Sequence, residues 1–443
     1  YKIDGKNQFT ERRQSEMEMK NREVIKNFLQ EMEEKAADCR QLWEQFSRCF
    51  LNTLETTMKI MDDGTVHVIT GDIPAMWLRD STAQIRPFLF LAKEDEEMRK
   101  LAAGLVRRQF FYITLDPYAN AFNDSPNGAC WEKDDPEPSP WVWERKFEVD
   151  SLCYPLQLAW MLWKNTGCTE QFGGYFTEGA KKILEVFRIE QNHEENSSYR
   201  FRRNSYFKDT LSRDGKGALV KPDTGLIWSG FRPSDDACTY GYLIPSNMFA
   251  VVVLGYLEEI AREILKDEEM EREAGCLREQ VHAAVEKYGR TKTEEFGVVY
   301  AYEVDGYGMF CLMDDANVPS LLSMSYLGYP ADPDTMERTR RMLLSEANPY
   351  YYSGKAAVGI GSSHTPSRYI WPIALAIQGL TEPSRSEKQK ILETLASTTG
   401  GTGLMHEGFC VDDPKRYTRE WFSWANAMYM ELFLDFLGYR LEI

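Results

Sequence analysis

The sequence predicts an all-α protein in which paired helices close on themselves as a helical toroid, with small β-hairpins on the loops. Two observations lead to this prediction. Apolar residues recur at three- and four-residue spacing along most of the 443 residues, which is the period of an amphipathic helix. Alternating strand patterns, in contrast, are short and few.

About twelve segments have the helical period, and short connections with Gly, Pro or Asp join them in pairs. They are residues 17–36, 41–60, 81–95, 97–111, 151–166, 177–191, 246–265, 271–288, 333–345, 369–380, 386–397 and 420–437. Neither composition nor charge marks a domain boundary, and no fixed sequence period indicates a solenoid. We therefore expect a single domain over residues 1–443, with about the first 20 residues peripheral to it.

The clearest strand patterns, residues 65–70 and 298–304, are short enough to be hairpins on the loops. Three longer connections lie between helices, at residues 112–148, 200–244 and 347–368, and each is rich in Trp, Tyr, Asn and Gly. Long ordered loops in a compact protein are more often functional than not. The sequence thus predicts a functional site built from these loops.

The chain is acidic, with a net charge of −17 and a pI near 5.0, and it has no block of Lys and Arg. Nucleic acids and anionic membranes bind basic surfaces, so neither is expected as a partner. The longest apolar runs, such as residues 248–257, are too short to cross a bilayer. We expect a monomer that acts on a neutral substrate.

The N-terminal segment has no apolar core of a signal peptide. The nine cysteines are scattered from Cys39 to Cys410 without a CxxC motif. This pattern is typical of reduced thiols that pack inside a protein, and it predicts a cytoplasmic location.

Common cofactor and metal motifs are absent from the sequence. The segment "GIGSSH" (359–364) lacks the third glycine of a dinucleotide-binding loop, and no GxxxxGK motif occurs. The segment "HEGFC" (406–410) lacks the second histidine of a zinc protease helix, and the five histidines are far apart. We therefore expect neither a metal nor a cofactor.

Carboxylates embedded in aromatic loops are the strongest candidates for chemistry. Asp235 and Asp236 follow a turn-forming Pro-Ser pair, and their ordinary interpretation is as caps of the next helix. Glu407 follows a glycine run and sits between apolar residues, where an acid is either partnered or functional. Two acids from separate aromatic loops suit glycoside hydrolysis. One acid protonates the leaving oxygen, and the other activates water or attacks the sugar.

The segment "GDIPAMWLRD" (71–80) crowds Asp72, Trp77, Arg79 and Asp80 together just before a helix. One interpretation is the wall of a sugar subsite, because rings stack on sugar faces and charged groups hold hydroxyls. The other is a buried ion pair of Arg79 with Asp80 or Asp72 that fixes a loop against the core. Spacing alone favours neither.

Several blocks of the chain together resemble glycoside hydrolase family 125, the bacterial and fungal exo-α-1,6-mannosidases. They are "TGDIPAMWLRDSTAQIRP" (70–87), "WVWERKFEVDSLCYPLQLA" (141–159), "FRPSDD" (231–236), "LIPSNMFAVVVLGY" (243–256), "MDDANVPSLL" (313–322), "GIGSSHT" (359–365), "RYIWPIALAIQGLT" (368–381), "GGTGLMHEGF" (400–409) and "REWFSWANAM" (419–428). The blocks follow one another in family order over nearly the whole chain.

The resemblance implies an (α/α)6 barrel and a metal-independent, inverting exo-α-1,6-mannosidase that acts on oligosaccharides from N-glycans or mannan. It matches Asp235 to the general acid and Glu407 to the general base, although spacing leaves Asp236 open as the acid. Inversion requires the two carboxyl groups to stand roughly 6.5–9.5 Å apart. The acid also needs a raised pKa, from burial or a neighbouring negative charge.

Further residues are expected to bind the sugar. Trp77, Arg79 and Asp80 would close a blind pocket of the kind that an exo-acting enzyme needs. The other expected sugar-binding residues are Asp72, Trp143, Arg232, Asp236 and His364. Two other functions remain open: a related helical-barrel α-glucosidase, and a mannan-binding protein without catalysis.

Overall fold

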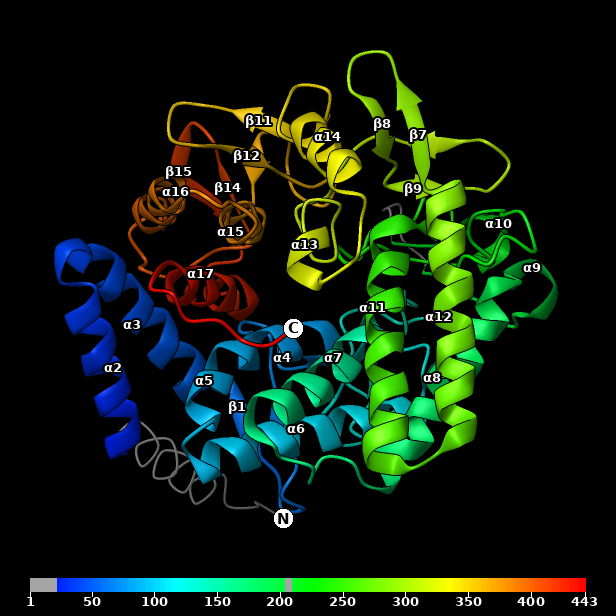
Figure 1. Cartoon of the computed structure of the whole chain (residues 1–443), viewed down its shortest axis with the longest axis horizontal. Coiled ribbons are helices and arrows are strands. Elements are labelled where there is room, and N and C mark those ends of the chain that lie inside the picture. The colour runs from blue at the N-terminus through cyan, green and yellow to red at the C-terminus, as the bar shows by residue number, and fades with distance from the viewer. Residues whose placement is uncertain (1–21, 204–208) are drawn as a thin grey trace.

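The computed structural model describes residues 22–203 and 209–443. Helices form most of its regular structure and lie around a common centre (Figure 1). The expectation that about the first 20 residues are peripheral concerns residues outside the described part. Within that part, no helix combines the length and apolar composition that crossing a membrane requires. All nine cysteines are free thiols.

The helices nearest the centre are buried around most of their circumference. They are α4 (Leu78–Ile85), α7 (Val149–Thr166), α11 (Ile244–Ile260), α15 (Pro372–Leu380) and α17 (Ser423–Phe436). A helix that is apolar all round must be covered on all sides, which suits the sequences of α7, α11, α15 and α17 to the centre. α4 differs, because it buries polar residues such as Arg79 and Asp80. In the structure α4 packs on α7 and α17, α7 packs on α11, and α15 packs on α17.

A second set of helices covers the first and buries only one face. It consists of α3 (Arg40–Thr56), α6 (Glu96–Leu115), α8 (Gly174–Gln191), α12 (Glu268–Tyr288), α14 (Pro333–Leu343) and α16 (Arg385–Ser397). α12 packs on α11, α6 on α7, α3 on α17, and α16 on α15. The pairs α6–α7, α11–α12 and α15–α16 are neighbours along the chain, as predicted, whereas α3 packs on α17 from the other end of the chain. The remaining helices are α2 (Glu23–Lys35), α5 (Leu89–Ala92), α9 (His193–Asn196), α10 (Ser212–Gly215) and α13 (Met324–Leu327).

Most predicted helices begin or end a few residues away from their observed bounds, and three examples also change the type of secondary structure. The segment 81–95 is interrupted at Arg86–Phe88 because Pro87 has no N–H to donate to the helix. The segment 41–60 ends at Thr56, since Met58–Ile60 leaves the helix as a strand. The segment 246–265 ends as a π-helix at Ala261–Leu265.

The strands form two- and three-stranded antiparallel sheets on the connections between helices. Two-stranded sheets pair β1 (Met58–Ile60) with β2 (Val66–Val68), β7 (Arg290–Thr293) with β8 (Gly297–Tyr300), and β11 (Tyr351–Ser353) with β12 (Val358–Ile360). The first three-stranded sheet consists of β3 (Met76–Trp77), β4 (Ala121–Phe122) and β5 (Val142–Glu144). The second consists of β6 (Tyr242–Leu243), β9 (Glu303–Val304) and β10 (Phe310–Cys311). The third consists of β13 (Tyr369–Ile370), β14 (Gly408–Cys410) and β15 (Asp413–Thr418). The predicted hairpins on loops are confirmed by β1–β2 and β7–β8.

Candidate active site

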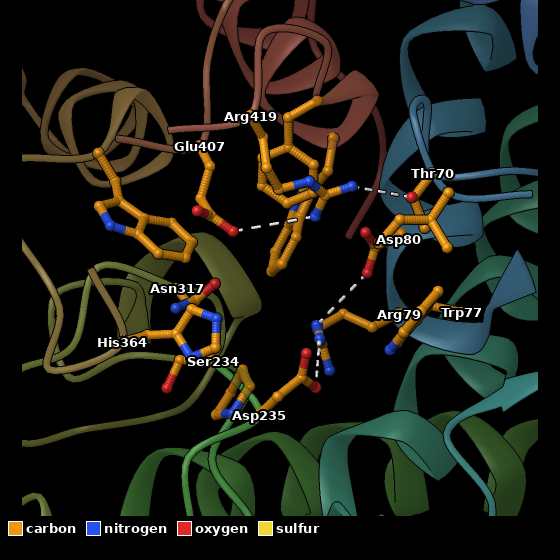
Figure 2. Close-up of a pocket in the computed structure, with 15 residues that line it drawn as sticks. Thr70, Trp77, Arg79, Asp80, Ser234, Asp235, Asn317, His364, Glu407 and Arg419 are labelled. Carbon is orange, nitrogen blue, oxygen red and sulfur yellow. Dashed lines mark hydrogen bonds and ion pairs between the residues drawn. The ribbon is translucent and has the colours of Figure 1, made fainter. Parts of the chain in front are cut away.

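One pocket is lined by side chains from two of the three long connections found in the sequence, residues 200–244 and 347–368. Its empty volume is about 370 Å³, including the part that is open to solvent. Its lining consists of Thr70, Ile73, Trp77, Arg79, Asp80, Pro233, Ser234, Asp235, Asn317, His364, Trp371, Glu407, Arg419, Phe422 and Trp424. Figure 2 shows Asp235 and Glu407 entering the pocket from opposite sides.

A tight turn presents Asp235 to the pocket. The Asp235 N–H donates to the carbonyl of Arg232 over 2.9 Å, and the Arg232 N–H donates to the carbonyl of Asp236 over 2.9 Å. Asp235 itself has a φ of 68°, a left-handed conformation that Asp tolerates better than most residues. Such strained positions concentrate at functional sites. The turn leaves the Asp235 side chain 25% exposed, whereas that of Asp236 is 6% exposed.

Glu407 is held at the start of β14. Its N–H donates to the carbonyl of Thr418 over 3.3 Å, so the β14–β15 sheet fixes its backbone. The preceding His406 is buried and stacks on Tyr417, with ring centroids 3.8 Å apart. The Glu407 carboxylate lies 3.9 Å from Arg419 Nη1 and faces the pocket (Figure 2).

Asp235 is ionised at neutral pH. Burial alone would raise the pKa of this carboxyl, but the positive charges of Lys146, Arg79 and His364 and a hydrogen bond with Glu148 outweigh burial and lower it to about 2. The expectation that the acid has a raised pKa is therefore wrong for Asp235. The neighbouring carboxylate of Asp236 is paired with His364.

Arg79 is the centre of a buried ion cluster. Its guanidinium donates through Nη1 to Glu148 and lies 3.6 Å from Asp80, 3.7 Å from Asp150 and 3.7 Å from Asp235. The side chain is 4% exposed, yet it lines the pocket. The ion-pair interpretation of the 71–80 segment is confirmed for Arg79 and Asp80, while the sugar-wall interpretation stays a prediction for an arginine that also lines the pocket. The main partner, however, is Glu148 rather than Asp72.

His364 is positively charged at neutral pH. Burial alone would lower its pKa, but a hydrogen bond to Asp236 and the negative charges of Glu407, Asp236 and Asp235 raise it to about 9. The Nδ1–H donates to Asp236 Oδ1 over 3.0 Å, and Ser363 donates to the same carboxylate. Asp236 therefore orients His364 from behind the pocket.

Arg419 was not among the predicted site residues, although it begins the block "REWFSWANAM". Its guanidinium makes paired contacts of 3.0 and 3.2 Å from Nε to the two oxygens of Asp72, and Nη2 donates to Thr70 over 3.0 Å. Asp72 holds Arg419 against Glu407 but does not line the pocket itself.

The structure separates the ten predicted site residues into two groups. Six of them line the pocket: Trp77, Arg79, Asp80, Asp235, His364 and Glu407. Asp72 and Asp236 lie behind it, as described above. Arg232 donates to Glu303 over 2.6 Å, and Trp143 is buried against Trp77, so neither lines the pocket. Their prediction as sugar contacts overlooked these internal partners.

Besides Arg419, the prediction missed Asn317, Trp371 and Trp424. Asn317 comes from the block "MDDANVPSLL" and the two tryptophans from other family-like blocks. The signal was present in these blocks, but nothing local in the sequence ranks one polar or aromatic residue of a block above another.

Several polar atoms of the pocket wall have no hydrogen bond within the described part of the chain. They are Trp77 Nε1, Arg79 Nε, Asp80 Oδ2 and Trp424 Nε1. Burial raises the pKa of Asp80 to about 6 against the charges of Arg79 and Arg419. Arg79 Nε and Asp80 Oδ2 lie 3.6 Å from each other, so their charges are paired although no hydrogen bond joins them.

Among residues 22–203 and 209–443, no group of three or more His, Cys, Asp or Glu side chains is arranged to hold a metal ion. The family model described as metal-independent α-mannosidase, GH125, matches residues 39–434. The Schizosaccharomyces pombe protein called meiotically up-regulated gene 157 protein is 37% identical over 437 residues, which cover 93% of this chain and 85% of that protein.

Solved structures agree with this match. A Streptococcus pneumoniae structure, from work on metal-independent α-mannosidases and the processing of N-linked glycans, is a non-productive complex with α-1,6-mannobiose. It is 50% identical, with a TM-score of 0.92, and the alignment covers 95% of this chain and 99% of that one. A bacterial glucoamylase in complex with acarbose has a TM-score of 0.55 at 11% identity, covering 90% of this chain and 56% of that one, and is similar in fold alone.

Proposed function

The chain belongs to glycoside hydrolase family 125, the metal-independent α-mannosidases, and we propose that it removes a terminal α-1,6-linked mannose from oligosaccharides with inversion of configuration. The observation that carries this proposal is the placement of Asp235 and Glu407, which approach one pocket from opposite sides (Figure 2). The complex of the 50% identical relative with α-1,6-mannobiose supports the linkage.

In the proposed mechanism Asp235 protonates the glycosidic oxygen and Glu407 takes a proton from the attacking water. The bond from C1 to the leaving oxygen breaks while the water oxygen bonds to C1 from the other side of the ring. Arg419, itself held by Asp72, lies beside the Glu407 carboxylate and fixes its position. The product is β-mannose and a shortened oligosaccharide.

The polar side chains of the pocket wall suit a sugar at the reacting position. A hydroxyl can donate to the Asp80 carboxylate and accept from the Trp77 indole N–H, both of which line the pocket. The cationic His364 and the amide of Asn317 lie on the opposite flank in Figure 2. We assign Trp77, Arg79 and Asp80 to the closed end that makes the enzyme exo-acting.

We also propose that the inner and outer helices form a complete (α/α)6 barrel within a single domain, as the resemblance implies. The packing of α4, α7, α11, α15 and α17 around one centre supports this arrangement. The glucoamylase-like folds among the solved structures support it further.

Hydrolysis of α-1,6-mannobiose tests the proposed function. We expect turnover of this disaccharide, little or none of matched α-glucosides, and no loss of activity in EDTA, because the hydroxyls are held by side chains. The likeness in fold to a glucoamylase makes α-glucoside the informative control. Preference for α-glucosides would favour the α-glucosidase, and binding of mannosides without turnover would favour a mannan-binding protein.

A further inference from the structure

Asp235 is ionised at neutral pH, and yet as the general acid it must deliver a proton to the leaving oxygen. A second carboxyl group, Glu148, lies directly behind Asp235. Glu148 precedes α7, and its side chain is 0% exposed. It makes a hydrogen bond with Asp235, and it does not line the pocket.

The carboxyl groups of Glu148 and Asp235 share two neighbours, Asn120 and Arg79. Asn120 Nδ2 lies 3.5 Å from Glu148 Oε1 and 3.4 Å from Asp235 Oδ1. Arg79 donates through Nη1 to Glu148 Oε2, while its Nη2 lies 3.7 Å from Asp235 Oδ1. Ser151 donates to Glu148 Oε2 over 2.7 Å, so Ser151 and Arg79 share that oxygen while Asn120 bridges Oε1 to Asp235.

Two carboxylates at hydrogen-bond distance repel strongly when both are ionised, so such a pair retains one proton between them. The more buried member keeps it when no substrate is present, because burial disfavours charge. Burial raises the pKa of Glu148 well above its usual range, and the charges of Asp235 and Asp150 add to that effect against Arg79. The proton of the pair therefore resides on Glu148 rather than on Asp235.

We infer that Glu148 is a positioning residue that stores the catalytic proton and passes it to Asp235 as the glycosidic bond breaks. This inference rests on the proposed function of Asp235 as the acid. The proton leaves the Glu148 carboxyl for one oxygen of Asp235, and Asp235 gives a proton to the leaving oxygen. Glu407 meanwhile takes a proton from water. That proton returns to solvent, from which the pair of carboxyl groups recovers its own.

Charges from every neighbouring element act on this pair and fix the direction of the pH effect. They are Arg79 and Asp80 at the start of α4, Lys146 and Asp150 on either side of Glu148, and His364 from the loop before β13. The Cys238 thiol is also close, and burial raises its pKa. The cations nearest Asp235 stabilise its ionised form. Asp235 alone would thus hold a proton poorly at neutral pH.

Glu148→Gln tests the inference through the pH dependence of kcat/KM on α-1,6-mannobiose. We expect the fall of activity at high pH to shift to lower pH by about one unit or more, because glutamine cannot store the proton. Activity on an aryl mannoside with an activated leaving group, which needs little acid assistance, should change far less. A loss that is merely structural would reduce both substrates equally without moving the profile.

A second variant acts in the opposite direction. Ser151→Ala removes a donor that stabilises ionised Glu148, so the pair should hold its proton more tightly and the high-pH fall should move to higher pH. This variant decides the question if Glu148→Gln does not fold. Opposite shifts from two neighbouring substitutions are not expected from packing defects.

Glu431→Gln is the matched control. Glu431 is a buried acid 3.1 Å from Arg86, and it accepts from Tyr326 over 2.9 Å, outside the pocket lining. Its substitution also leaves an arginine without its charge partner, but it should leave the pH profile in place. If the wild-type enzyme is active and neither Glu148→Gln nor Ser151→Ala changes the pH profile, the inference is wrong but the proposed function stands. A wild type that does not cleave mannobiose would instead overturn the proposed function.

Discussion

Asp235→Asn is expected to lower kcat/KM on α-1,6-mannobiose by about 10²–10⁴-fold while an activated aryl mannoside is affected far less. The sugar leaving group is a poor one and must be protonated as the bond breaks, whereas an activated phenolate leaves without help. The variant should fold, since an asparagine can keep the contact that Asn120 makes with Asp235. Steady-state rates on the two substrates measure this contrast.

The comparison of substrates is what makes this test specific to a general acid. An equal loss on both substrates would mean that residue 235 acts in binding or in folding rather than in proton transfer. The melting temperature of the variant serves as the control for folding. Asp236→Asn is the informative neighbour, because it removes the partner of His364 and should not reproduce the dependence on leaving group.

Glu407→Gln is expected to abolish turnover on both kinds of substrate. Activation of water is needed whatever the leaving group, so an activated phenolate does not spare the variant. We expect a loss of about 10²–10⁴-fold or more, the range for removal of a general base. The fold should tolerate the change because Arg419 retains its paired contacts with Asp72.

The two variants thus differ in one measurable respect, the response to leaving group. If Glu407→Gln kept activity on the aryl mannoside but lost it on mannobiose, the roles assigned to the two carboxyl groups would have to be exchanged. Retained activity on both substrates would remove Glu407 from the mechanism.

Much of the fold could be predicted because helical periodicity is a local property of the sequence. The buried helices α7 and α11 follow from their continuous apolar character, and the family-like blocks placed Asp235 and Glu407 in one site. The interruption at Pro87 was also visible in the sequence, although the predicted helix ran through it.

The site was harder to predict where its geometry depends on contacts between distant residues. Arg79 pairs with Glu148, 69 positions along the chain, and no local pattern indicates that partner. The choice between Asp235 and Asp236 as the pocket residue follows from a backbone φ of 68°, which the sequence does not specify. Trp143 resembled a sugar-stacking residue because its loop is aromatic, but the β3–β4–β5 sheet buries it.

The same long-range contacts explain why the pKa of Asp235 was predicted to shift in the wrong direction. A neighbouring negative charge was expected to raise the pKa of the acid, but the carboxylate next to Asp235, that of Asp236, accepts hydrogen bonds from His364 and Ser363. The cations Arg79 and Lys146, brought in from other loops, dominate instead. Electrostatics of this kind depends on the assembled pocket rather than on neighbours in sequence.

Proton NMR of freshly hydrolysed α-1,6-mannobiose tests the central claim most directly. The wild-type enzyme is expected to release β-mannose first, with the α-anomer appearing only later as the free sugar mutarotates. This result follows from water attacking on the Glu407 side while Asp235 protonates the leaving oxygen on the other. First appearance of α-mannose, or no release of mannose at all, would contradict the account.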